Sequence, residues 1–296
     1  MLAGIHFILT YTCNYECDHC FVYSNPQAKG TFTLNQIKKV FEELTNIKTV
    51  KRVYFEGGEA FLFYPLMVEG IKIARNQGLE TGIVTNAYWA TTEEDAELWL
   101  KPLLELGISD LTLSDDFFHS GDEKASPAKN ALAAAEKLGI PVGVISIEKP
   151  KIEKSHDIAK GDSIVGGVMF RGRAAEKLIN GLPTRSWRDF TECPHEDLRN
   201  PKRIHLDAYG NVLLCQGLSI GNMWQTPLSE LISNYDCDLH PISKLLVEGG
   251  PARLAKECSV KYNNEYVDAC HLCYELRLKL RDKFSEYLAP RQVYGL

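Results

Sequence analysis

Three cysteines lie close together just after the first apolar segment of the chain. Cys13, Cys17 and Cys20 follow residues 5–10 with the spacing C-x3-C-x2-C, and residues 5–10 have the apolar character of a buried strand. Three thiolates at this spacing suit an iron–sulfur cluster and leave one iron open, whereas a structural zinc site takes four ligands. A zinc knuckle with His19 as the fourth ligand is the alternative.

The other six cysteines all lie beyond residue 190, and residues 21–192 contain none. A secreted disulfide framework spreads its bridges through a small, loop-rich fold. Two cysteine groups separated by a long cysteine-free stretch instead favour metal or cluster ligation in a reducing compartment. We therefore expect a cytoplasmic protein without disulfides.

Apolar strand-like runs alternate with segments of helical periodicity through the first 180 residues. Strands are expected at 5–10, 50–55, 81–85, 108–114, 141–147 and 165–170, and helices at 34–47, 65–76, 92–106, 127–138 and 174–180. This alternation predicts an α/β fold with a parallel sheet and right-handed crossovers. The sheet can stay open or close into a barrel, and in both cases the loops after the strands carry the chemistry.

The pattern changes after about residue 190. Residues 203–206 and 212–214 are typical of a hairpin turned at 209–211, and modest helices are expected at 227–233 and 270–284. We therefore expect two domains, a larger one over 1–185 and a smaller α+β one over 186–296.

Composition excludes several classes of function. The formal net charge is −6 and the pI is about 5.8, which argues against a nucleic-acid partner because such proteins usually carry a basic face. No run of about eighteen apolar residues is present, so no membrane span is expected. The first ten residues lack the basic region and cleavage site of a signal peptide.

A second motif, Gly57-Gly58-Glu59, ends the second expected strand. Two glycines allow a close backbone approach, and a carboxylate can bind an ammonium group. Together with the cysteine loop, this segment resembles the radical S-adenosylmethionine (SAM) superfamily over roughly residues 5–180. The resemblance implies a partial (β/α)6 TIM-like barrel in which Cys13, Cys17 and Cys20 hold a catalytic 4Fe-4S cluster.

The resemblance also implies the reaction: SAM is cleaved reductively to a 5′-deoxyadenosyl radical, which abstracts a substrate hydrogen atom. The Gly57–Glu59 segment would hold the SAM amino group. The backbone of His19, where the family usually has an aromatic residue, would contact adenine.

Further SAM contacts are expected after the third, fourth and sixth strands. The family contacts the SAM ribose and carboxylate from positions similar to Asn86, Ser114 and Asp115, although helix capping is the alternative for Asn86 and Asp115. Arg171 could clamp the SAM carboxylate, the alternative being that Arg171 and Arg173 are a solvated pair of charges.

The second cysteine group contains a plausible complete set of four thiolates: Cys193, Cys215, Cys270 and Cys273. The G-x4-C ending at Cys215 and the later C-x2-C resemble the twitch domain, the shortened SPASM domain, although the gap of sixteen residues between Cys193 and Gly210 is longer than usual. The resemblance implies one auxiliary 4Fe-4S cluster, with zinc as the alternative. Cys237 and Cys258 are expected to be small buried residues, with Cys258 as the more plausible substitute ligand.

These resemblances favour an enzyme that modifies a peptide or protein, as ribosomal peptide maturases do. The alternatives are a small-molecule alcohol dehydrogenase of the twitch type and a non-catalytic zinc or iron–sulfur binding protein. Expected partners are the peptide or small-molecule substrate and an electron donor such as flavodoxin or ferredoxin. Because the chain begins at its first strand, a peptide-recognition domain would be a separate protein.

Overall fold

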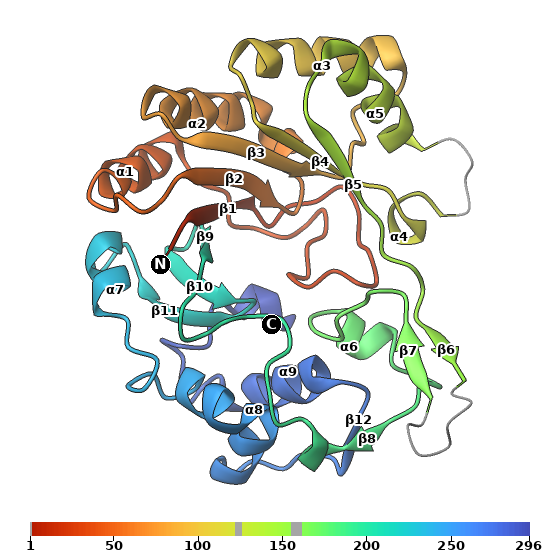
Figure 1. Ribbon diagram of the computed structural model, residues 1–296, viewed down its shortest axis with the longest axis vertical. Coiled ribbons are helices and arrows are strands. Elements are labelled where there is room, and N and C mark those ends of the chain that lie inside the picture. The colour runs from red at the N-terminus through yellow and green to blue at the C-terminus, as the bar shows by residue number, and fades with distance from the viewer. Residues whose placement is uncertain (1, 122–125, 155–161) are drawn as a thin grey trace.

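The computed structural model describes residues 2–121, 126–154 and 162–296 of the chain. Its centre is an eight-stranded sheet with the strand order β11-β10-β9-β1-β2-β3-β4-β5 (Figure 1). The six strands from β9 to β5 run parallel, and β10 and β11 are antiparallel additions at one edge. The chain thus has the predicted α/β fold, with a mainly parallel sheet like a partial TIM barrel.

The strands of the main sheet are short and follow the apolar runs of the sequence. They are β1 (Gly4–Thr10), β2 (Arg52–Gly57), β3 (Glu80–Thr85), β4 (Asp110–Ser114), β5 (Val142–Ile145), β9 (Arg203–Asp207), β10 (Asn211–Cys215) and β11 (Leu218–Asn222). Two small pairs lie apart from this sheet: β6 (Lys151–Glu153) with β7 (Ser163–Val165), and β8 (Arg185–Ser186) with β12 (Glu265–Tyr266).

The helices form two groups, one from the first half of the chain and one from the C-terminal part. The longer helices of the first half are α1 (Leu34–Leu44), α2 (Tyr64–Asn76), α3 (Glu93–Glu105) and α5 (Pro127–Leu138), with the short α4 (Phe117–Ser120) and α6 (Ala174–Lys177). The C-terminal helices are α7 (Leu228–Asn234), α8 (Ser243–Glu257) and α9 (Ala269–Leu280). In Figure 1, α1, α2, α3 and α5 lie along the outer side of the sheet, whereas α8 and α9 lie below the β9–β11 edge. No helix in the described ranges is long and apolar enough to cross a membrane.

The sixth parallel strand does not come from the expected segment. The prediction of a sheet strand at 165–170 is wrong, because Ser163–Val165 instead forms an exposed antiparallel pair with β6. The sixth parallel strand is β9, which pairs with β1 at the other edge of the parallel set. The hairpin predicted around 209–211 does form, but it extends the main sheet rather than a separate one. The division of the chain into a domain over 1–185 and a smaller one over 186–296 remains a prediction.

The strands of the barrel alternate between two faces. In β1, Ile5, Phe7 and Leu9 are fully buried on the outer face, where they pack into the hydrophobic core. Gly4, His6 and Ile8, between them, face the inside of the partial barrel and line its cavity. Successive side chains of a strand point to opposite faces, so a strand can build the core with one set of residues and a site with the other.

A buried polar contact joins the ends of β1 and β9. The hydroxyl of Tyr11 donates a hydrogen bond of 3.0 Å to Asp207. Asn211 donates to the same carboxylate from its backbone and its side chain. Burial raises the pKa of Asp207 to about 6 although these donors lower it. The contact fixes the C-terminal hairpin against the strand that leads into the cysteine loop.

Candidate active site

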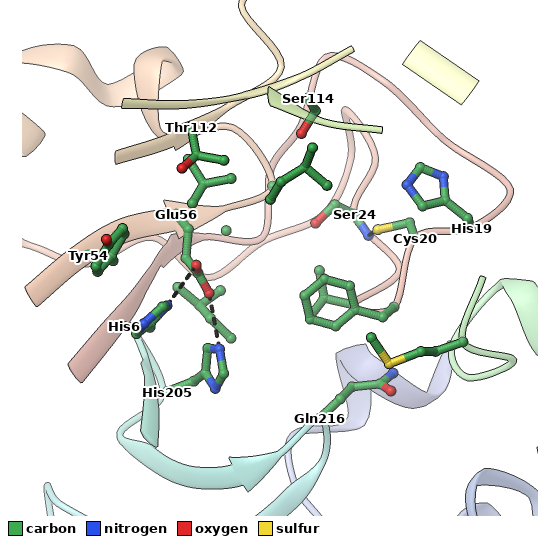
Figure 2. A pocket seen from close by; sticks show the side chains of 18 of the residues that line it. His6, His19, Cys20, Ser24, Tyr54, Glu56, Thr112, Ser114, His205 and Gln216 are labelled. Carbon is green, nitrogen blue, oxygen red and sulfur yellow. Dashed lines mark hydrogen bonds and ion pairs between the residues drawn. The ribbon is translucent and has the colours of Figure 1, made fainter. Parts of the chain in front are cut away.

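A cavity of about 850 Å3 fills the inside of the partial barrel. Its wall consists of inward-facing strand residues, the cysteine loop, and parts of the segments around residues 170, 200 and 293. Figure 2 shows that Cys20 and His19 lie at one end of the cavity and His6, Glu56 and His205 at the other. The site therefore lies in the barrel interior and reaches the carboxyl ends of the parallel strands, as the sequence predicts.

The cysteine loop is held by backbone contacts and by one arginine. The backbone N–H of Cys13 donates to Asn25 at 3.1 Å, and that of Cys20 donates to Cys17 at 3.0 Å. The side chain of Arg173 donates to the carbonyls of Cys17 at 2.6 Å and Ser24 at 2.9 Å. Arg173 is 4% exposed, so the alternative of a solvated charge is excluded for this residue: it holds the loop in place from a distant part of the chain.

Cys13, Cys17 and Cys20 all line the cavity. Burial raises the pKa of the Cys13 thiol to about 11, and burial together with the neighbouring Cys20 and Cys13 raises that of Cys17. Buried thiols disfavour their thiolate forms unless a cation joins them. Three thiols at the edge of an open cavity therefore fit a cluster that leaves one iron accessible to a ligand.

The Gly57–Gly58 pair lies against the strand that carries the cysteine loop. Gly57 has φ +139°, and a Cβ there would come within 2.3 Å of the Thr10 carbonyl oxygen. A Cβ on Gly58 would come within 2.2 Å of the Thr12 carbonyl oxygen. Both glycines line the cavity, and the close approach that requires them is to the chain's own backbone.

Glu59, the last residue of the Gly57-Gly58-Glu59 motif, lies behind the cavity wall. It is 1% exposed and is not among the residues that line the cavity. Its carboxylate caps the turn that follows, accepting from the Phe61 N–H at 3.0 Å, and it also accepts from the Thr85 hydroxyl at 2.8 Å and the Asn86 N–H at 2.7 Å. Burial raises its pKa to about 7 although these donors lower it. Glu59 thus holds the cavity wall from outside the cavity, and its contact with the SAM amino group stays a prediction.

Asn86 and Ser114 line the cavity as expected, whereas Asp115 does not. The Asn86 side chain donates to Asn14 at 2.9 Å and lies 3.6 Å from the Cys13 sulfur, so it contacts the cysteine loop directly. The Asp115 N–H still pairs with Ile145 of β5. Strand alternation thus accounts for the inward position of Ser114 and the absence of Asp115 from the cavity wall, and the SAM contact of Asp115 stays a prediction.

Asp116, one residue further on, is the buried carboxylate of this corner. It caps α4 by accepting from the backbone N–H groups of Phe118 and His119, and it lies 2.8 Å from the His119 ring nitrogen Nδ1. His19 lines the cavity, with its ring 4.6 Å from Phe118 and 5.3 Å from His119 between centroids. Burial lowers the pKa of His19 to about 4, so its imidazole is neutral at pH 7.

The four cysteines of the expected auxiliary set come together. Cys193, Cys215, Cys270 and Cys273 all line a second, small cavity of about 30 Å3 between the β10 end and the first turn of α9. None of the nine cysteines forms a disulfide. Burial raises the pKa of Cys273 to about 11. Four thiols without disulfide partners around one small cavity fit the four-cysteine ligand set of an iron–sulfur cluster.

A glycine brings the first of these cysteines into place. Helix α8 is broken at Gly249 and Gly250, and Gly250 has φ +64°. A Cβ on Gly250 would come within 2.3 Å of the backbone at Thr191 and Glu192. The segment before Cys193 can therefore lie directly on the helix, a contact that the sequence pattern did not reveal.

Two buried arginines lie beside the four thiols. Arg171 is 8% exposed and donates to the Cys215 sulfur at 3.1 Å, and Arg277 is 2% exposed and donates to the Gln216 carbonyl. Both line the second cavity. Arg171 also lines the large cavity, so it forms part of the wall between the two sites. Its guanidinium group is engaged by a thiol, which differs from the clamp expected for the SAM carboxylate.

Cys237 and Cys258 are absent from the wall of the second cavity as the structure describes it. Cys237 is 3% exposed, and Cys258 ends α8 and packs against the core. This agrees with their interpretation as small packing residues.

Sequence reasoning missed a polar group at the far end of the large cavity. His6, Glu56 and His205 come from three neighbouring strands and face one another inside the barrel (Figure 2). Each of these polar residues stands in an otherwise apolar strand segment, and this pattern in the sequence could have marked it as a candidate site residue. Burial raises the pKa of the Glu56 carboxyl, but the two imidazoles lower it by more than burial raises it. The pKa of Glu56 therefore lies well below its usual range.

The sequence is similar to known proteins over part of its length. The sequence model of the radical SAM superfamily matches residues 7–148. YydG of Bacillus subtilis (strain 168), a protein named for peptide biosynthesis, is 28% identical over 156 residues, which are 52% of this chain and 49% of YydG. The PqqA peptide cyclase of Bradyrhizobium diazoefficiens is 36% identical over 105 residues, 34% of this chain and 26% of the cyclase.

These matches span about half or less of the curated relatives. Among solved structures, a crystal structure of BtrN in complex with AdoMet and 2-DOIA aligns with a TM-score of 0.53 and 16% identity, over 88% of this chain and 94% of that chain. This likeness shows a shared fold that includes most of the chain.

The buried position of Glu59 predicts a pH-dependent effect on stability. Because its pKa is raised from 4.5 to about 7 in the folded protein, its stabilising contribution is complete below pH 4.5 and is lost as the pH rises through 7. The advantage of the wild type over Glu59→Gln in free energy of unfolding should therefore shrink by about 2.5 kcal/mol between pH 5 and pH 8. Anaerobic urea unfolding at both pH values measures it. If the wild type and Glu59→Gln differed equally in free energy of unfolding at both pH values, and the variant lost its affinity for SAM, direct contact between Glu59 and SAM would be supported instead.

Proposed function

On the premise that this chain is a radical SAM enzyme, we propose that it abstracts a hydrogen atom from a residue of a peptide or protein. The observation that carries the proposal is that the three cysteines of the loop and the Gly57–Gly58 turn line one cavity. When bound at the loop, a reduced 4Fe-4S cluster supplies the electron that cleaves SAM to methionine and a 5′-deoxyadenosyl radical.

The chain's own residues bind and orient these groups. Cys13, Cys17 and Cys20 ligate the cluster, and Arg173 keeps their loop in place through the Cys17 carbonyl. Backbone groups of Gly57 and Gly58, with the side chains of Asn86 and Ser114, provide the polar contacts for SAM from the ends of β2, β3 and β4. Glu59 holds Asn86 and Thr85 in position from outside the cavity. The apolar residues between these groups exclude water from the reacting centre.

The size of the cavity limits the substrate. A volume of about 850 Å3 lies within the roughly 300–1,000 Å3 typical of a site for one drug-sized ligand. SAM takes up part of this space, so what remains accommodates one side chain or one small molecule. The hypothesis that the substrate is a peptide is supported by the partial similarity to YydG and to the PqqA peptide cyclase. A peptide would place a single residue in the cavity and leave the rest of its chain outside.

The second cysteine site supports an electron-transfer role. Four thiols that line one cavity would hold an auxiliary 4Fe-4S cluster in a twitch-like C-terminal region, residues 186–296. Arg171 and Arg277 place two positive charges beside these thiols, which favours acceptance of an electron by compensating the added negative charge. The shared wall at Arg171 brings the two sites into contact. Flavodoxin or ferredoxin would supply the first electron.

Iron content tests the assignment of two clusters. We expect about eight irons per chain in the wild type reconstituted anaerobically, and about four in Cys215→Ala and in Cys273→Ala, because each variant loses one four-iron cluster. Cys237→Ala and Cys258→Ala are matched controls and should keep the wild-type iron content. Loss of iron in a control variant, or full iron retention in both Cys215→Ala and Cys273→Ala, would refute the ligand set.

Deuterium transfer tests the class of substrate. Extracts of cells grown on deuterated amino acids are separated into peptide and small-molecule fractions, and each is incubated with the enzyme, SAM and dithionite. We expect deuterium in 5′-deoxyadenosine with the peptide fraction alone, because the abstracted atom moves to that product. The Cys17→Ala variant is the control and should give no labelled product. Label that arises only from the small-molecule fraction would overturn the peptide proposal.

A further inference from the structure

The register of the sheet aligns polar residues in one row across the barrel interior. His6 of β1 pairs laterally with His205 of β9 on one side and with Tyr54 of β2 on the other. Tyr54 in turn pairs with Gly82 of β3. Glu56, two residues after Tyr54, faces the same side one step along β2. Three strands thus present two imidazoles and a carboxylate to the same part of the cavity.

The three side chains converge. His6 Nδ1 lies 2.9 Å from one carboxylate oxygen of Glu56, and His205 Nε2 lies 3.2 Å from the other. One potential ligand atom from each residue lies within 4.8 Å of the other two. Each side chain is 15% exposed, and all three line the large cavity. The group is therefore shielded from bulk solvent but open toward the substrate space.

A packed neighbour holds the arrangement in shape. The Tyr54 ring stacks on the His6 ring with the centroids 4.7 Å apart and an interplanar angle of 13°. A Cβ on Gly82 would come within 2.3 Å of that tyrosine ring, so the missing side chain makes room for it. Orientation of a ligating imidazole by packed or bonded neighbours is a usual property of metal sites.

We propose that His6, Glu56 and His205 form a binding site for a divalent transition-metal ion inside the barrel, separate from both cysteine sites. Two imidazoles and one carboxylate on one side of an ion are the ligand set of catalytic zinc and of non-haem iron, and such sites keep positions open for water or substrate. Here the open positions face the cavity. An ion in this site would bind a carboxylate, carbonyl or hydroxyl oxygen of the substrate at the end opposite the three-cysteine loop.

Charged residues of both signs line this part of the cavity, and Lys202 is one of the cations. Arg52 and Arg203 line the cavity near this end, but Arg52 lies 3.8 Å from Glu80 and Arg203 lies 3.4 Å from Glu196. Asp110 also lines the cavity. Among the described residues the Glu56 carboxylate is paired only with the two imidazoles, so an ion that binds here takes the place of contacts within the three ligands and displaces no other partner.

Binding of Mn2+ to the cluster-loaded enzyme tests the site. Mn2+ prefers oxygen and nitrogen ligands to thiolates, so it leaves the cysteine sites intact, and the sharp EPR signal of free Mn2+ falls as the ion binds. We expect saturation at about one Mn2+ per chain, and an affinity at least about tenfold weaker in Glu56→Gln and in His205→Gln. Tyr54→Phe keeps all three ligands and the ring stack, and should bind as the wild type does.

The results of this experiment distinguish failure of the metal-site proposal from failure of the proposed radical SAM activity. Iron content and thermal midpoint of each variant show whether it is folded and cluster-loaded. No Mn2+ binding by the wild type would overturn the metal site while leaving 5′-deoxyadenosine formation unaffected. A different outcome would also refute the proposal: Mn2+ binding that persists in both ligand variants and is lost in His119→Gln. That result would assign the ion to the group of His19, Asp116 and His119.

Discussion

The site depends on the close packing of two backbones where β1 and β2 end. The N–H of Gly58 donates to the Thr10 carbonyl at 2.7 Å, and the N–H of Glu59 donates to the Thr12 carbonyl at 3.0 Å. No side chain fits at positions 57 and 58, because a Cβ at either would come within 2.3 Å of a carbonyl oxygen. This contact sets where the cysteine loop leaves the sheet. It also places the Glu59 carboxylate under Thr85 and Asn86, so that the ends of three strands are fixed relative to one another.

The remainder of the catalytic region follows from strand alternation and from contacts made by the C-terminal half. Outward-facing residues such as Phe7 and Phe55 build the core against the helices, while their inward-facing neighbours build the cavity. Arg173 then fastens the cysteine loop, and Tyr11 fastens β1 to Asp207 beyond it. The C-terminal half thus contacts both the end of β1 and the cysteine loop, and its cysteine site meets the cavity at Arg171.

Local patterns were enough to predict the strands and helices of the first half, and they singled out the four cysteines that line the second cavity. They were not enough for features set by tertiary contact. The sixth parallel strand comes from 203–207 because β9 pairs with β1, which lies far from it in sequence. Glu59 turned out to cap its own turn, since a motif does not show which way a carboxylate faces. His6, Glu56 and His205 are separated by up to 199 positions in the chain, and only the register of the sheet brings them together.

The most direct test of the account is formation of 5′-deoxyadenosine by the anaerobically reconstituted enzyme with dithionite and SAM. We expect SAM-dependent product from the wild type and none from Cys17→Ala, which removes one ligand of the cluster while leaving the Gly57–Gly58 turn unchanged. The Cys237→Ala variant should match the wild type, because Cys237 lies outside both cavities. Absence of product from a wild-type enzyme with its full iron content, or equal product from Cys17→Ala, would contradict the central claim.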